Sequence, residues 1–279
     1  MDIKAIVLDI DGTLLNDEKQ LTAKTKEALI NAQESGIKVI LASGRPTSGI
    51  VHYAEELKMN QHNGLIVSYN GAHVLDVCTK KELFSQPLSV ENSKKILAHL
   101  KQFDVIPMVA IDEYMYVNNV FEGMLDLNIS DEPFNIIEYE ARGGNFHLCE
   151  KADLASFVNV PLHKILVAAQ PEYLQSHWEK LLAPFKETVS GMFSAPMYFE
   201  FTDQGIDKAN ALEQTLKPLG IHKEHIVSFG DGHNDLSLIT YAGMGIAMGN
   251  AVDELKSIAD RTTSSNNDDG IAKALAELL

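Results

Sequence analysis

The sequence predicts an α/β protein with a doubly wound parallel sheet and an α+β domain inserted into it. Three observations predict this fold. Short apolar runs alternate with amphipathic stretches in both flanks of the chain, the middle contains closely spaced strand candidates, and 279 residues suit one large domain or two ordinary ones. Strand–helix–strand alternation favours a parallel sheet with helices on both faces, because successive parallel strands need crossover connections.

The N-terminal flank contains apolar runs that are typical of buried parallel strands, at residues 3–8, 37–42 and 65–69. These runs are continuous in Val, Ile and Leu instead of alternating with polar residues, which indicates that both of their faces are covered. Between the first two runs, Thr22 can cap an amphipathic helix, and another helix is expected after Pro46.

The C-terminal third repeats this rhythm, with a helix that begins near Lys208, a strand at 226–229 and further helix and strand candidates. The middle differs, because helices and adjacent strand candidates occur there in groups around an irregular stretch. We therefore expect a discontinuous catalytic core of residues 1–84 and 197–279, and an inserted α+β domain of residues 85–196.

Composition and charge restrict the function. The chain has 39 acidic and 23 basic residues and a formal net charge of −16, so its overall field repels nucleic acid and anionic membrane surfaces. No apolar run approaches the roughly 18 residues that span a membrane, and the N-terminus does not have the pattern of a signal peptide. Cys78 and Cys149 are too few for a disulfide framework. We expect a cytoplasmic protein with no nucleic-acid or membrane partner.

Polar side chains follow the predicted strands where ligands bind in sheets of this kind. Asp9 and Asp11 follow the first strand, Ser43 follows the second, and Asp231 follows the strand at 226–229. Because the carboxyl ends of parallel strands border the ligand crevice, these residues should converge there. Asn234 and Asp235 lie just beyond Asp231, and Lys208 begins a predicted helix.

This set of residues can carry out metal-assisted phosphoryl transfer. Clustered carboxylates repel one another unless a cation neutralises them, and hard oxygen ligands favour Mg²⁺. One carboxylate can act as a nucleophile, while Lys208 and Ser43 bind phosphoryl oxygens. Asp11, two residues beyond Asp9, can protonate the leaving-group oxygen and then activate water.

The motifs resemble those of a known family. DIDGTL at 9–14, Ser43 in ASGRP, Lys208 in DKANAL and GDGHNDLSLI at 230–239 resemble, in order, the four motifs of the haloacid dehalogenase-like (HAD) superfamily. SYNGA at 68–72, AMGNA at 247–251 and SNNDDGIAKAL at 265–275 narrow the resemblance to the Cof-type family of subclass IIB. Its members are mostly Mg²⁺-dependent phosphatases of sugar phosphates and related metabolites, with a Rossmannoid core and an inserted cap domain.

The resemblance implies a role for each site residue. Asp9 would be the nucleophile and a Mg²⁺ ligand, Asp11 the general acid/base and a ligand through its backbone carbonyl, and Asp231 the third protein ligand. Phosphate would be bound by Ile10, Ser43, Gly44, Lys208 and Asn234. Asp235 would support the metal shell, and Arg45 would line the pocket edge or pair with a surface acid. Ala209 stands where the family often has Gly, which leaves the role of the lysine unchanged.

The sequence leaves three functions open. The first is a phosphatase that acts on a small phosphorylated metabolite. The second is a phosphotransferase or phosphomutase on the same scaffold, in which a sugar hydroxyl replaces water. The third is a non-enzymatic phospho-switch such as a receiver domain, which the position of Asp9 after the first strand disfavours. We expect the insert to act as a lid that sets substrate choice. The sequence carries no information on protein partners, which stay unknown at this point.

Overall fold

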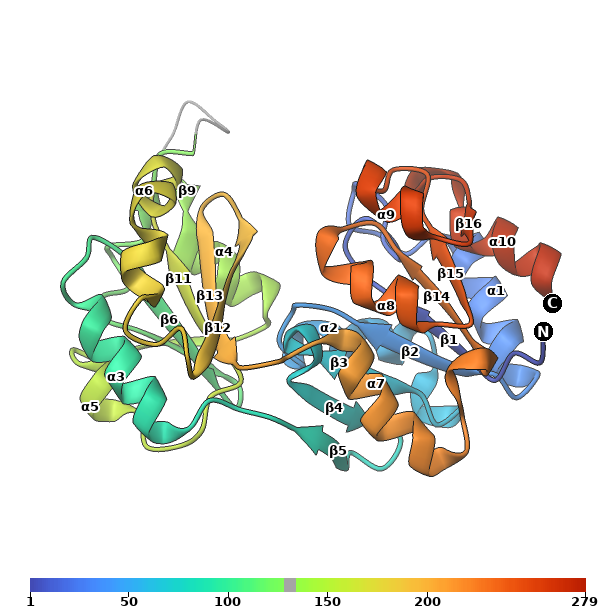
Figure 1. Cartoon of the computed structure of the whole chain (residues 1–279), viewed down its shortest axis with the longest axis horizontal. Coiled ribbons are helices and arrows are strands. Elements are labelled where there is room, and N and C mark those ends of the chain that lie inside the picture. Colours follow the sequence, from blue (N-terminus) through green and yellow to red (C-terminus); the bar gives the residue numbers. More distant parts are fainter. Residues whose placement is uncertain (128–133) are drawn as a thin grey trace. The chain divides into compact units, whose positions relative to one another are not determined.

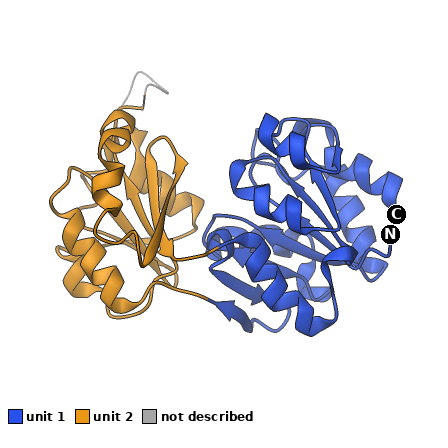
Figure 2. Ribbon diagram, viewed as in Figure 1, with its two compact units in different colours: residues 1–85, 207–279 blue, residues 86–206 orange. Residues whose placement is uncertain are grey.

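The computed structural model describes residues 1–127 and 134–279, which divide into two compact units. The first unit comprises residues 1–85 and 207–279, and the second comprises residues 86–206 (Figure 2). The second unit ends at Ile206 and not at the expected residue 196, because the strand Tyr198–Asp203 pairs inside the second unit. Each unit is described separately below.

The first unit alternates strands and helices in the order expected from the sequence (Figure 1). Its N-terminal segment contains β1 (Ala5–Leu8), α1 (Ala23–Glu34), β2 (Lys38–Ala42), α2 (Ser48–Glu56), β3 (Leu65–Ser68), β4 (His73–Asp76) and β5 (Glu82–Ser85). Its C-terminal segment contains α7 (Lys208–Leu216), β14 (Ile226–Gly230), α8 (Leu236–Tyr241), β15 (Met244–Ala247), α9 (Asp253–Ile258), β16 (Arg261–Thr262) and α10 (Gly270–Leu278).

These strands form one sheet in the order β16-β15-β14-β1-β2-β3-β4-β5. Pairing is parallel from β16 to β3, which confirms the predicted doubly wound sheet. The sequence did not predict that β4 and β5 extend the sheet in antiparallel pairing. Because β1 pairs with both β2 and β14, the two segments of the unit meet beside it. From β1 the strand order runs outward through β2 and β3 on one side and through β14 and β15 on the other. In doubly wound sheets the ligand crevice lies at the point where the order changes direction.

Both faces of the sheet are covered by helices, which explains the continuous apolar runs in its strands. Ile6 and Leu8 of β1 belong to a core that also contains residues of α1, α2 and α10. Ala5 and Val7 point to the opposite face, where residues of α7 and α8 complete the core. Thr22 caps α1 as predicted, since its side chain accepts a hydrogen bond from the Thr25 backbone N–H.

The second unit is an α+β domain. It contains α3 (Val90–Leu100), β6 (Ile106–Ile111), β7 (Tyr114–Val117), β8 (Met124–Leu125), β9 (Phe134–Asn135), α4 (Ile136–Gly143), β10 (His147–Glu150), α5 (Leu154–Phe157), β11 (Ile165–Ala168), α6 (Pro171–Leu182), β12 (Val189–Ala195) and β13 (Tyr198–Asp203). Six of the strands form a sheet in the order β10-β7-β6-β11-β13-β12. The sequence indicated an irregular stretch where α4 occurs, because a helix of eight residues gives little periodic signal.

Apolar residues cover both faces of this second sheet. One core contains residues of α3, α5 and α6 together with Phe199 and Phe201. The other contains Ile136 and Ile137 of α4 packed with Met108 of β6. Among the helices in the described part of the chain, none is both long and apolar enough to cross a membrane.

We expect Phe201→Ala to destabilise the second unit by about 3–5 kcal/mol, because Phe201 is fully buried and its loss leaves a cavity. Phe121→Ala is the matched control, since Phe121 is 86% exposed and its removal should change stability by less than about 0.5 kcal/mol. Urea unfolding followed by circular dichroism measures both changes. Equal stability of the two variants would contradict the assigned core.

Candidate active site

Two acidic residues meet at the carboxyl ends of adjacent parallel strands. Asp9 follows β1 and Asp231 follows β14, and these strands pair with Leu8 opposite Phe229. The Asp9 backbone N–H donates to the Phe229 carbonyl at 3.1 Å, which continues the pairing one residue beyond β1. The register of the sheet therefore brings together residues that are more than two hundred positions apart in the sequence.

A buried lysine lies between two of the acids. The Lys208 Nζ donates to Asp9 Oδ1 and to Asp235 Oδ1, each at 2.7 Å, and its side chain is 1% exposed. Lys208 is held at the start of α7 because the Asp207 carboxylate caps that helix, accepting from Ala209 N and Asn210 N. Burial alone would lower the pKa of Lys208, but Asp235 and Asp9 outweigh burial and hold it above its ordinary value.

The acids of this cluster are perturbed by burial and by one another. Burial raises the pKa of Asp9 well above its ordinary value, Asp235 raises it further, and Lys208 opposes both. Burial also raises the pKa of Asp231 to about 6, although Asp231 Oδ1 accepts from the Thr13 hydroxyl at 2.7 Å. Asp235 is fully buried, and its Oδ2 accepts from the backbone N–H groups of Asp231 and Gly232. One ammonium therefore faces three carboxyl groups.

This donor set fits a hard divalent cation. Asp9, Asp231 and Asp235 each offer a carboxylate oxygen, and these oxygens lie within 4.8 Å of one another. Burial and neighbouring carboxylates raise the pKa values of Asp9 and Asp231, so a further positive charge would stabilise the ionised forms of both groups. Oxygen ligands and a mixture of buried and half-buried acids suit Mg²⁺, which keeps some of its waters.

The side chain of Asp11 lies outside this cluster and is held by two cations. Arg45 binds it in a bidentate ion pair, with Nε–Oδ2 and Nη2–Oδ1 distances of 2.7 Å each. Lys19 Nζ donates to Asp11 Oδ1 at 2.9 Å. Burial would raise the pKa of Asp11, but Arg45 and Lys19 outweigh burial and lower it. The structure thus pairs Arg45 with an acid of the candidate site.

Three of the predicted phosphate-binding residues lie beside a turn that had no predicted role. Ser43 is 3% exposed and follows β2, and Gly44 lies beside the side chain of Asn70. The Asn234 Nδ2 donates to Asn70 Oδ1 at 3.2 Å. The Asn70 backbone N–H donates to the Ser43 carbonyl at 3.0 Å, so Asn70 contacts both loops. Asn70 belongs to SYNGA, whose paired Asn-Gly could have indicated a left-handed turn.

Ile10 and Thr13 shape the loop that follows β1. Ile10 is fully buried, and its carbonyl accepts from the backbone N–H groups of Thr13 and Leu15. Gly12 has a φ of +78°, and a Cβ built on it would lie 2.3 Å from Asp231 Oδ2. Only glycine therefore fits between this loop and Asp231. Thr13 had no predicted role, yet its hydroxyl donates to Asp231 and fixes the position of that carboxylate.

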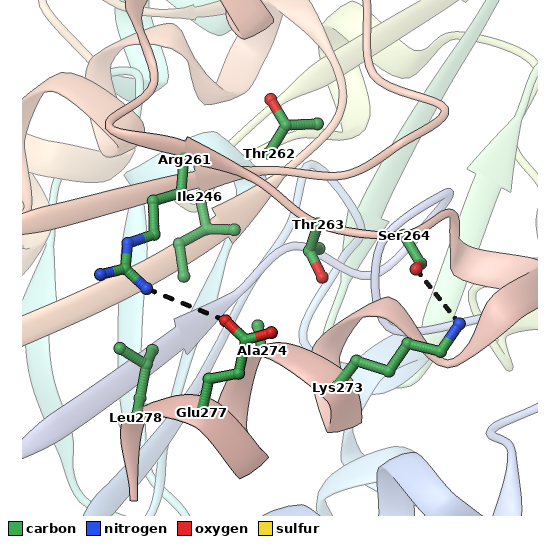
Figure 3. A pocket seen from close by; sticks show the side chains of 9 residues that line it. All are labelled: Ile246, Arg261, Thr262, Thr263, Ser264, Lys273, Ala274, Glu277 and Leu278. Carbon is green, nitrogen blue, oxygen red and sulfur yellow. Dashed lines mark hydrogen bonds and ion pairs between the residues drawn. The ribbon is translucent and has the colours of Figure 1, made fainter.

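A surface cavity of about 320 Å³ lies elsewhere in the first unit, between the β16 segment and α10 (Figure 3). It is lined by Arg261 and Lys273 among others, and it contains none of the predicted site residues. Glu277 and Ser264 engage these two cations, at 4.0 Å and 3.1 Å respectively. The acidic cluster, and not this cavity, is the candidate active site.

Comparison with known proteins agrees with this geometry. The model of the haloacid dehalogenase-like hydrolase family matches residues 6–275. The 5-amino-6-(5-phospho-D-ribitylamino)uracil phosphatase YitU of Bacillus subtilis is 30% identical over 280 residues, which cover 98% of this chain and 96% of that protein.

Solved structures extend the comparison. A haloacid dehalogenase-like hydrolase from Bacteroides thetaiotaomicron matches with a TM-score of 0.91 at 33% identity, covering 99% of this chain and 100% of that one. The HAD subclass IIB sugar phosphatase BT4131 matches with a TM-score of 0.78 at 25% identity, covering 99% and 98% of the two chains.

The doubly wound sheet and the acidic cluster at the ends of its strands define a protein with a Rossmannoid α/β core and an acidic site. The chain belongs to the haloacid dehalogenase-like hydrolase family, in its Cof-type branch. The predicted enzyme class, a phosphatase, is confirmed by this family and by the phosphatase names of its relatives.

We expect Lys208→Met to destabilise the first unit by about 3–5 kcal/mol at pH 7, because it leaves buried Asp9 and Asp235 without their cation. The loss should be smaller at pH 5: burial already raises the pKa of Asp9 and the loss of Lys208 raises it further, so lowering the pH protonates Asp9 and reduces the repulsion. Urea unfolding at both pH values measures the change.

Lys95→Met is the control, because the Lys95–Glu91 pair is exposed and contributes little. Adding Asp235→Asn to Lys208→Met should restore part of the lost stability. A double variant no more stable than the single one would contradict the buried charge cluster.

Proposed function

We propose that the protein is a Mg²⁺-dependent phosphatase that hydrolyses small phosphate monoesters through an aspartyl-phosphate on Asp9. The observation that carries the proposal is the cluster of Lys208 with Asp9, Asp235 and Asp231 at the carboxyl ends of β1 and β14. A phosphoryl group needs a nucleophile, cations for its oxygens and a proton for its leaving group. Residues for each of these tasks lie in or beside this cluster.

In the first half-reaction the Asp9 carboxylate attacks phosphorus. The new bond joins an Asp9 oxygen to phosphorus, and the bond from phosphorus to the ester oxygen breaks. Asp11 gives its proton to the departing oxygen, so that an alcohol leaves. In the second half-reaction Asp11 takes a proton from water, which attacks phosphorus and releases inorganic phosphate with Asp9 regenerated.

Proton donation by Asp11 requires a change of partner. Arg45 and Lys19 favour the charged form of this carboxyl in the structure described above. Asp11 therefore has to separate from Arg45 before it can hold a proton near a leaving group. A side-chain rotation achieves this without moving the backbone, and the freed Arg45 can then attract an anionic substrate.

Cations and dipoles of the chain stabilise the phosphoryl group. Lys208 lies against Asp9, so its ammonium adjoins the atom that would bind phosphorus. Ser43, Gly44, Ile10 and Asn234 would contribute hydroxyl, backbone and amide donors. A bound Mg²⁺, held by Asp9, Asp231 and the Asp11 carbonyl with support from Asp235, would neutralise negative charge on the phosphoryl oxygens.

We infer that the substrate is a small phosphorylated metabolite, with sugar phosphates the first class to test. BT4131 is named a sugar phosphatase, and YitU is named for a substrate with a phosphorylated ribityl chain. Both names describe polyhydroxylated phosphate monoesters. The net charge of −16 supports a small substrate over a polyanion.

We expect Asp9→Asn to reduce kcat by at least about 10³-fold, because an amide cannot form the aspartyl-phosphate. Phosphate release from p-nitrophenyl phosphate measures the loss, and circular dichroism checks that the fold is retained. Asp2→Asn is the control, because Asp2 is exposed near the N-terminus. Turnover of Asp9→Asn at the rate of the unmodified protein would refute the mechanism.

We expect MgCl₂ to raise the melting temperature of the protein and EDTA to reverse the rise, because a cation that binds only the folded state stabilises it. The effect should be lost in Asp231→Asn, which removes a carboxylate of the cluster. NaCl at matched ionic strength is the control. An equal rise with NaCl would show screening and no specific site.

The substrate is best found by a phosphate-release screen of sugar phosphates, nucleotides, pyridoxal phosphate and other small phosphoesters. Product analysis of each hit separates hydrolysis from phosphoryl transfer. Free phosphate with a dephosphorylated product supports the phosphatase. An isomerised sugar phosphate without free phosphate would identify a phosphomutase instead.

A further inference from the structure

The loop that carries Asp11 is bound by side chains from the far end of the sequence. Gly12 and Leu15 lie in this loop, and their carbonyl oxygens accept hydrogen bonds from asparagine amides. Asn250 Nδ2 donates to the Gly12 carbonyl at 2.8 Å, and Asn266 Nδ2 donates to the Leu15 carbonyl at 3.0 Å. AMGNA and SNNDDG, the two C-terminal motifs without an assigned role, contain these asparagines.

The two asparagines act together. The Asn266 backbone N–H donates to Asn250 Oδ1 at 3.0 Å, so the backbone at Asn266 orients the Asn250 side chain. Asn266 is 5% exposed, and its bond to Leu15 is buried. Asn266 Nδ2 also donates to Asp17 Oδ1 at 3.0 Å, at the far end of the loop. A buried carbonyl that loses its donor is costly, so this contact restrains the loop more than an exposed bond does.

The loop also has hydrogen bonds within itself and to the acidic cluster. The Thr13 and Leu15 N–H groups donate to the Ile10 carbonyl, and the Thr13 hydroxyl donates to Asp231. The carbonyls of Gly12 and Leu15 accept from Asn250 and Asn266. The Thr13 side chain thus connects the loop to the acidic cluster, and two backbone carbonyls connect it to the asparagines.

We propose that Asn266, with Asn250, is a positioning residue for Asp11: it fixes the backbone of residues 10–15 so that only the Asp11 side chain moves between Arg45 and the leaving group. This inference rests on the proposed function, in which Asp11 is the general acid. A loop that drifts would lose proton donation first, because proton transfer needs hydrogen-bond distance between the carboxyl and the leaving oxygen. Attack by Asp9, which is anchored to β14, would be affected less.

The test compares two leaving groups. The leaving group of a sugar phosphate is a basic alkoxide, which needs a proton. The leaving group of p-nitrophenyl phosphate is a weakly basic phenolate, which needs little proton donation. For the sugar phosphate that the unmodified enzyme hydrolyses fastest, we expect Asn266→Ala to lower kcat/KM by about 100-fold. For p-nitrophenyl phosphate the expected loss is about 3-fold.

A second asparagine variant and a control variant complete the comparison. Asn250→Ala removes the exposed member of the pair. We expect it to lower kcat/KM for the sugar phosphate by about 10-fold and to affect p-nitrophenyl phosphate less. Asn31→Ala is the control, because Asn31 is exposed on α1 in the same unit. It should leave both rates within about 2-fold of the unmodified enzyme. If Asn266→Ala does not fold, Asn250→Ala carries the test.

A second readout does not depend on activity. Hydrogen exchange of a peptide that covers residues 9–17 should be about 10-fold faster in Asn266→Ala than in the unmodified protein without metal, while exchange across β14 stays unchanged. Unchanged exchange at 9–17 would overturn the proposal. Equal acceleration over the whole first unit would also overturn it, because the asparagine would then be a general stabiliser.

Asp11→Asn separates failure of this inference from failure of the proposed function. This variant should lose about 10²–10⁴-fold on the sugar phosphate and much less on p-nitrophenyl phosphate. If Asp11→Asn is selective and both asparagine variants are not, the positioning role is wrong. If Asp11→Asn shows no selectivity, the general-acid role is wrong, and the exchange measurement alone decides whether the asparagines restrain the loop.

Discussion

The site depends on one buried ammonium. Lys208 donates a hydrogen bond to Asp9 and another to Asp235, at the same distance. Two carboxyl groups can be buried beside each other here because the ammonium lies between them. Each isolated carboxylate would be costly to remove from water, and the three of the cluster would repel one another. The lysine compensates part of this cost and leaves an excess of negative charge. That excess would favour the binding of a further cation.

The position of Lys208 depends in turn on strained backbone beside it. Tyr69, Asn70 and Gly71 all have positive φ values, of 53°, 56° and 109°. A Cβ on Gly71 would lie 2.3 Å from the Asp207 carbonyl, so this turn packs directly against the start of α7. Three left-handed residues in a row are unfavourable unless their surroundings hold them, and such strain is concentrated at functional sites. Here the turn lets Asn70 touch both the Ser43 loop and Asn234.

The parts of the site that sequence reasoning could find are those that follow strong local patterns. Asp9 and Asp231 follow apolar runs, and Lys208 begins an amphipathic stretch, so predicted strand ends and a predicted helix start singled out all three. Asn70, Thr13 and Asn266 act through contacts with residues far away in the chain, which no local periodicity encodes. The same limit explains why the boundary of the second unit was misplaced. The apolar run of β13 looks like any buried strand, and only its pairing with β11 and β12 in the folded protein assigns it to the sheet of the second unit.

In the proposed mechanism Asp11 faces two conflicting demands, which the proposed restraint on its loop would divide between backbone and side chain. As a carboxylate it pairs with Arg45, whereas as an acid it must hold a proton. If the whole loop moved between these states, the contacts of Thr13 with Asp231 would break, and the acidic cluster would change with each turnover. A restrained backbone confines the change to one side chain. The general acid can then exchange partners while Asp231 and Asp9 keep their places, so proton transfer and nucleophilic attack can use the same short loop.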